Sequence, residues 1–118
     1  MAIKDGLLAE LDNEMPGTRK TLERVPEKLF AWKPHDKSFS MGHLASHIAN
    51  LPTWMGHTLT ADSIDLMPVG KPKVTTPQAK TNKELLELFD ANLKEARAIL
   101  AKASDEEMHR NWSLMGGG

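Results

Sequence analysis

The sequence contains no cysteine, no long apolar run and no excess of charge of either sign. The missing cysteine excludes disulfides, thiolate nucleophiles and cysteine-based zinc sites, and it fits a reducing compartment. Lys and Arg number 15 against 16 Asp and Glu, for a net charge of −1. This balance does not provide the basic surface that binding to a phosphate backbone requires, so we expect no nucleic-acid partner.

Signals for membranes, secretion and two common chemistries are also missing. No apolar segment approaches the roughly 20 residues that span a bilayer. The first residues, MAIKDGLLAELDNE, are charged and interrupted, unlike a signal peptide. Neither a G-x-S-x-G motif nor a phosphate-binding glycine loop is present. We therefore expect a cytoplasmic protein with no membrane partner.

What is present is the composition of an ordinary globular domain. The chain has 118 residues, of which 40% are hydrophobic and 26% are charged. This length predicts one domain, residues 1–118, with a single modest core. No stretch alternates cleanly between apolar and polar residues, so we expect no strand. The predicted fold class is all-α, an up-and-down helical bundle with three long helices.

Two of the long helices lie in the first half of the chain. Apolar residues recur every three or four positions over about residues 3–22, and the pattern keeps its phase through Pro16, which favours a kink over a break. The second helix covers about residues 40–60, with a kink expected at Pro52. The residues expected to form its inward-facing stripe are Met41, Leu44, Ile48, Leu51 and Met55.

The remaining chain alternates between connections and helix. Residues 24–40 form a connection with one helical turn after Pro26. Residues 61–80 form a long connection that is rich in proline, either a functional loop or a crossover along the bundle. A capping box of Thr81 and Glu84 begins the third long helix, which ends near residue 103.

The histidines of the second helix are the main candidates for chemistry. His43, His47, Trp54 and His57 fall on one side of this helix, and His47 borders the apolar stripe. A neutral imidazole inside a bundle is a good ligand for zinc or nickel if two or three further ligands converge on it. Periodicity alone favours the alternative, a packed histidine with one hydrogen bond. We name His47 as the candidate metal ligand, and His43, Trp54 and His57 as candidate pocket residues.

A longer pattern surrounds these residues. Residues 21–54 read TLERVPEKLFAWKPHDKSFSMGHLASHIANLPTW. This stretch resembles the DinB-like family, also called YfiT-like metal-dependent hydrolases. The shared pattern is a W-K-P-H-x-K-S connection, a G-x-L-A-x-H-I-A helix and a following L-P-x-W. The resemblance is most specific over these residues and looser over the third helix.

The resemblance implies a fold, a metal and a class of reaction. It implies a four-helix bundle of up-down-down-up type, often dimeric, with three histidines around nickel or zinc. His47 matches the histidine that the second helix contributes, and an H-x-x-x-H motif on a fourth helix supplies the other two. Relatives of this type act on small molecules as metal-dependent hydrolases or as transferases that use low-molecular-weight thiols.

The sequence departs from that pattern because no H-x-x-x-H pair follows the third helix, and the spacing occurs only at His43 and His47 in the second. A fragment, a natural truncation and a wall supplied by another subunit remain as explanations, and the terminal GGG favours a fragment. Three helices arranged for a fourth would expose an apolar groove, so we also expect a homodimer. The alternative function is a non-catalytic helical module that binds a ligand or a partner through the groove.

Overall fold

The computed structural model describes residues 2–66, 69–70 and 76–116. Most of this part is helical, which confirms the all-α prediction at that level. In chain order the elements are α1 (Ile3–Glu23), the short 3-10 helix η1 (Glu27–Leu29), α2 (Met41–Asn50), α3 (Thr53–Thr60), β1 (Ser63–Asp65), α4 (Asn82–Lys102), α5 (Asp105–Met108) and β2 (Ser113–Met115). Within the described ranges, no helix has both the length and the apolar character needed to cross a membrane.

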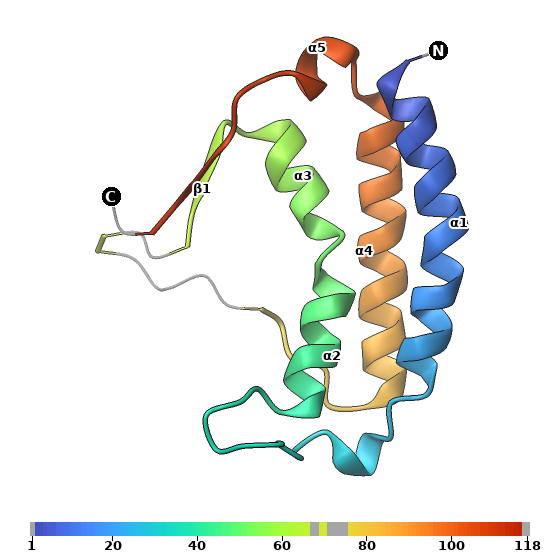
Figure 1. Ribbon diagram of the computed structural model, residues 1–118, viewed down its shortest axis with the longest axis vertical. Coiled ribbons are helices and arrows are strands. Elements are labelled where there is room, and N and C mark those ends of the chain that lie inside the picture. Colours follow the sequence, from blue (N-terminus) through green and yellow to red (C-terminus); the bar gives the residue numbers. More distant parts are fainter. Residues whose placement is uncertain (1, 67–68, 71–75, 117–118) are drawn as a thin grey trace.

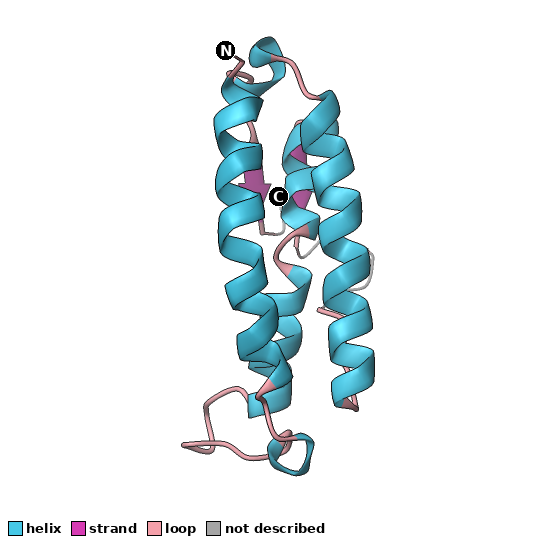
Figure 2. Cartoon of the chain, turned by 90° about the vertical axis from the view of Figure 1, so that its right-hand side faces the viewer, coloured by secondary structure: helices cyan, strands magenta, loops and turns pink. Residues whose placement is uncertain are grey.

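The long helices form three columns, with α4 standing between α1 and the α2–α3 pair in the view of Figure 1. Figure 2, from the side, shows α2–α3 behind α1 and α4. Helix α1 runs in one direction, and α2–α3 and α4 both run in the other. The directions therefore do not alternate strictly, because α3 ends at the opposite end of the bundle from the start of α4. Pro68 and Pro72 of the connection between them lie outside the described residues.

The core consists of two clusters along α4. The larger cluster joins all three columns, with Leu22 from α1, Ala45 and Ala49 from α2, and Leu85 and Phe89 from α4. The smaller cluster lies at the other end of the bundle and contains Leu59, Leu100 and Ala103. Helix α4 thus contributes to both clusters, because its apolar positions recur with helical spacing over its whole length.

Helix α2 packs with a different face from the one that its large apolar residues indicate. Its buried residues are Gly42, Ala45, Ser46 and Ala49, all small. Leu44 and Leu51, expected to face inward, are 51% and 46% exposed, so that part of the prediction is wrong. Small side chains let α2 approach its neighbours closely. A Cβ atom at position 42, for example, would lie 2.9 Å from Cβ of Phe30.

Proline breaks the second helix and leaves the first one continuous. Helix α1 continues through Pro16 to Glu23, as the phase of its apolar residues predicts. At Pro52 the expected kink is a full break into α2 and α3. Pro52 has no N–H to donate, and the Ile48 carbonyl instead accepts from the N–H of Leu51 at 3.3 Å.

Side chains from the connections fix where the helices begin. The Ser40 hydroxyl accepts from the N–H of His43 at 3.1 Å and begins α2. Thr81 accepts from the N–H of Glu84 at 3.1 Å, as expected at the start of α4. The Glu84 carboxylate, however, accepts from the N–H of Lys80 and closes the cap one residue earlier.

Two short strands were not expected from the sequence. Strands β1 and β2 pair in parallel, with Ser63 opposite Ser113 and Asp65 opposite Met115. They form an arm beside α3 (Figure 1). At three residues each, these strands are too short to show the alternation on which a sequence-based prediction depends.

Candidate functional site

The outer face of α2, defined by Leu44, His47 and Leu51, carries the candidate metal ligand. These residues lie on the side of the helix away from its small buried residues. The two leucines are about half exposed, and His47 between them is half-buried. His47 is thus placed on the side that the other long helices do not cover, and not among the core residues of this bundle.

The other histidine of α2 lies one turn earlier on the same flank. The His43 ring stacks on Phe39, with ring centroids 4.2 Å apart and an angle of 17° between the planes. Phe39 itself is 61% exposed. His43 and His47 therefore lie one turn apart beside the exposed apolar residues, the spacing at which two imidazoles can share one metal ion.

The two candidate pocket residues on α3 belong to an aromatic group. Trp54 makes edge-to-face contacts with His57, at 5.9 Å between ring centroids, and with Trp112, at 6.1 Å. The Trp112 indole N–H donates to the backbone carbonyl of His57 at 3.1 Å. Trp112 therefore fixes the start of the β2 segment against α3, a contact that sequence reasoning did not find.

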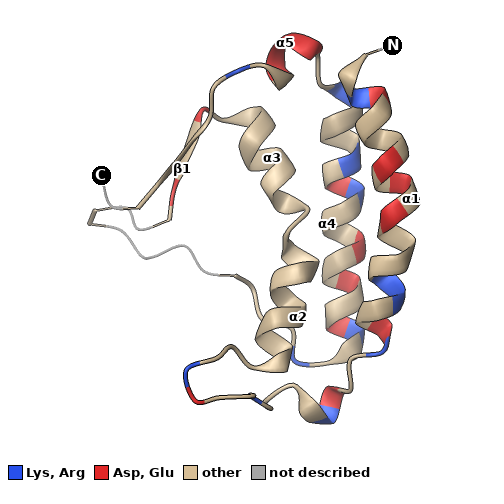
Figure 3. Cartoon of the chain, viewed as in Figure 1, with Lys and Arg blue, Asp and Glu red and all other residues tan. Residues whose placement is uncertain are grey.

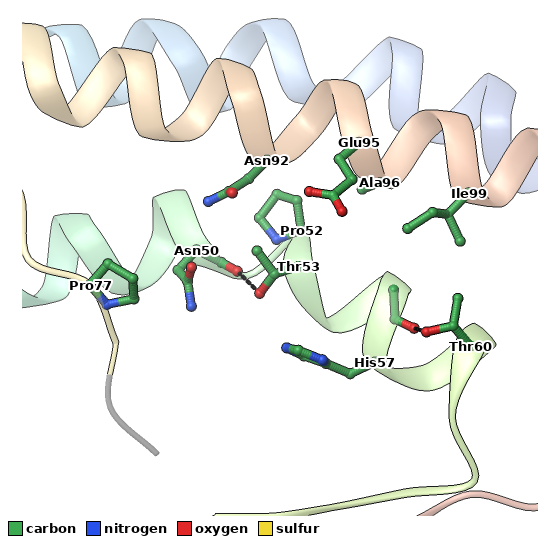
Figure 4. Close-up of a pocket in the computed structure, with 11 residues that line it drawn as sticks. Asn50, Pro52, Thr53, His57, Thr60, Pro77, Asn92, Glu95, Ala96 and Ile99 are labelled. Carbon is green, nitrogen blue, oxygen red and sulfur yellow. Dashed lines mark hydrogen bonds between the residues drawn. The ribbon is translucent and has the colours of Figure 1, made fainter. Parts of the chain in front are cut away.

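A cavity of about 510 Å³ lies between the broken second helix and α4 (Figure 4). Glu95 and His57 stand on opposite walls, from α4 and α3. Of the candidate pocket residues only His57 lines it, while His43 and Trp54 do not. The complete lining consists of Asn50, Pro52, Thr53, Gly56, His57, Thr60, Pro77, Asn92, Glu95, Ala96 and Ile99.

Sequence reasoning missed the α4 wall of this cavity. The Asn92 amide donates to the backbone carbonyl of Ala49 at 3.0 Å and connects α4 to the last turn of α2. Asn92, Glu95 and Ile99 recur at spacings of three and four on the side of α4 that also carries the buried Ala96. That spacing was the available signal, because polar residues next to a buried alanine indicate a wall that is only partly covered.

Charged residues gather away from α2 and α3 (Figure 3). Residues 41–60, which contain α2 and α3, include no Asp, Glu, Lys or Arg. Between α1 and α4, in contrast, Arg97 donates to Asp12 at 2.7 and 2.8 Å, and Arg19 donates to Asp90 at 2.9 Å. The bonded guanidinium groups hold the pKa of Asp12 and of Asp90 below the ordinary value of an aspartate.

No metal site is complete within one chain as far as it is described. Residues 2–66, 69–70 and 76–116 contain no group of three or more His, Asp or Glu side chains placed to hold a metal ion. His43 and His47 form a pair of imidazoles one turn apart on α2.

Comparison with known proteins did not place the chain in a family. No family model matches the sequence, and no curated protein or solved structure matches it. The functional argument therefore depends on the residues and their arrangement.

Proposed function

We propose that this chain is a helical bundle of the DinB-like type in which His47 supplies one ligand to a divalent metal, nickel or zinc. The other ligands come from a helix that packs against the outer face of α2. The complete assembly is then a metal-dependent hydrolase, or a transferase that uses a low-molecular-weight thiol, and acts on a small molecule.

One observation carries this proposal: an uncharged helix face presents a half-buried histidine between two exposed leucines. Leu44 and Leu51 are 51% and 46% exposed, and His47 lies between them. A helix covering the leucines would also exclude water from the imidazole. Such dry, hydrophobic surroundings are typical of metal sites that control the reactivity of a bound group.

The directions of the helices give further support. The resemblance implies an order of up, down, down and up. Helix α1 followed by α2–α3 and α4, the last two parallel, has the first three of these directions (Figure 1). A fourth helix running with α1 would complete that order.

The residues of a single chain do not by themselves fit a three-histidine site. The described ranges bring only His47 and its neighbour His43 to this face, and no third His, Asp or Glu joins them. A divalent metal would make a bound water or thiol more acidic and hence a better nucleophile near neutral pH. We therefore assign ligation to His47 and no reaction step to other residues.

The exposed leucines also favour a second function, a binding module without catalysis. A face with Leu44 and Leu51 half exposed and no charged side chain is suited to bind an apolar partner. In that case His47 is a packing residue and no metal binds.

Metal retention separates the two functions. After incubation with zinc or nickel and dialysis, elemental analysis should find metal in the unmodified protein and little in His47→Ala. The matched control is His109→Ala, which removes an exposed imidazole at the end of α5 and should leave the metal content unchanged. An unmodified protein without metal, or equal retention by His47→Ala, would support the binding module instead.

A further inference from the structure

We infer that the outer face of α2 binds a second copy of this chain, so that His43 and His47 of both copies surround one shared metal ion. The inference rests on the proposed function in one respect, that His47 binds a divalent metal. It adds the partner and the missing ligands, which neither the sequence pattern nor a single chain provides.

The absence of charge on this face favours a second copy. A two-fold interface is formed by the same surface of both copies, so charged residues near the axis would lie close to their own counterparts and repel them. Residues 41–60 contain no Asp, Glu, Lys or Arg. In contrast, α1 and α4 carry charged residues along their length (Figure 3), so the α2 face is the one best suited to pair with itself.

A single antiparallel register of the two α2 helices pairs the histidines with each other and Phe39 with Leu51. If the two α2 helices cross at the level of Ala45, His43 lies opposite the partner subunit's His47. The same register places Phe39, which is 61% exposed, opposite the partner subunit's Leu51. Both pairs are centred on position 45 of the sequence, with Phe39 just before the first turn of α2, so one two-fold axis brings both together. The large apolar groups on either side of the histidines then cover each other.

The size of the face suits a dimer that depends on its metal ion. The paired stretch, residues 39–51, is about 20 Å long at a rise of 1.5 Å per residue. Two such stretches side by side would remove no more than about 1,000 Å² from water, the lower limit for a specific interface. An interface of this size gains affinity from a ligand that binds only the paired state, as a shared metal ion would.

The four imidazoles fit the chemistry of a divalent ion. Two histidines one turn apart chelate a metal weakly, and two such pairs from facing helices supply the four nitrogen ligands of a tetrahedral zinc site. The stacking of His43 on Phe39 holds its ring on the flank next to His47. The leucines and Phe39 beside the imidazoles would exclude water from this site.

Light scattering with added metal tests the inference. With zinc, the mass should be twice the 13.1 kDa of one chain, and a chelator should lower the dimer affinity. Titration should give one zinc per two chains. His43→Ala and His47→Ala should each weaken zinc binding by roughly 100-fold, since loss of an outer-shell partner alone costs about 10–100-fold. His109→Ala, which removes an exposed imidazole at the end of α5, is the control that should retain it.

A pair of charge substitutions tests the register. Leu51→Lys and Phe39→Glu should each give a monomer, whereas the double variant should restore the dimer through two ion pairs across the axis. Leu7→Glu is the control, because Leu7 is 42% exposed on α1 and lies outside the interface. A monomer that binds one zinc per chain would overturn this inference and leave the proposed function standing. A chain that binds no zinc in any state would overturn both.

Discussion

The α1–α4 pair and the α2–α3 pair are stabilised differently. Helices α1 and α4 pack through large apolar residues and are joined at their edges by the Arg97–Asp12 and Arg19–Asp90 pairs. Helix α2 packs through small residues, and neither α2 nor α3 has a charged side chain. The charged helices keep their outer faces in water, while the uncharged pair presents leucines and histidines there. This difference indicates that α2 is the helix with an outer face suited to be covered.

The largest effect should come from enlarging the small inner face of α2. Ala49 is fully buried against the core, so Ala49→Leu should lower the free energy of unfolding by about 1–3 kcal/mol through overpacking. Urea denaturation measures this change. Ala91→Leu is the matched control, because Ala91 is exposed on α4 and should change stability by less than about 0.5 kcal/mol. Equal effects at both positions would contradict the close approach of α2 to the bundle.

An intermediate effect should follow from removing the bond between α4 and the broken helix. Asn92→Leu deletes the amide that donates to the Ala49 carbonyl at 3.0 Å. Loss of that hydrogen bond should destabilise the fold by about 0.5–1.5 kcal/mol, measured by urea denaturation. Asn13→Leu makes the same change at an exposed position of α1 and should have less effect. If the two variants are equally stable, Asn92 does not hold the helix break in place.

The smallest effect should be the pH dependence of the α1–α4 pair. The pKa values of Asp12 and Asp90 are lowered by hydrogen bonds from Arg97 and Arg19. Their contribution to stability is therefore complete above the pKa of an aspartate in the unfolded chain, and it is lost as the pH falls through the lower folded-state values. Thermal unfolding between neutral and acidic pH measures this loss, which should be small because the pairs are exposed.

The variants Asp12→Asn and Asp90→Asn should reduce that pH dependence. Glu14→Gln removes a similar charge from the exposed surface of α1 and serves as the control. An unchanged pH profile in the double aspartate variant would show that these pairs do not distinguish the α1–α4 pair from α2–α3.

Helical periodicity predicts the long elements well and the packing face of α2 poorly. The phase of the apolar residues extends α1 through Pro16, and Pro52 separates α2 from α3. The inner face of α2 was misassigned because Leu44 and Leu51 are much more hydrophobic than Ala45 and Ala49. Where helices pack closely, small residues are favoured at the contact. Which face of α2 makes that contact depends on neighbours that the local sequence does not contain.

The candidate sites depend even more on distant parts of the chain. Sequence spacing predicts that His43 and His47 share one flank of a helix. It cannot predict that Asn92 bonds to Ala49 or that Trp112 packs on Trp54, because each contact joins residues far apart in the chain. The functional role of His47 remains a prediction, and its placement on the uncovered face changes where the other ligands must be sought.

The β1–β2 ladder has a consequence for how the chain folds. Pairing of Ser63 with Ser113 closes a loop that contains the whole of α4. Closing so long a loop costs chain entropy that three residues of pairing cannot offset alone. The ladder must therefore form after α4 has docked against α3, and on partial unfolding it should be the first hydrogen-bonded segment to exchange its amide protons with the solvent.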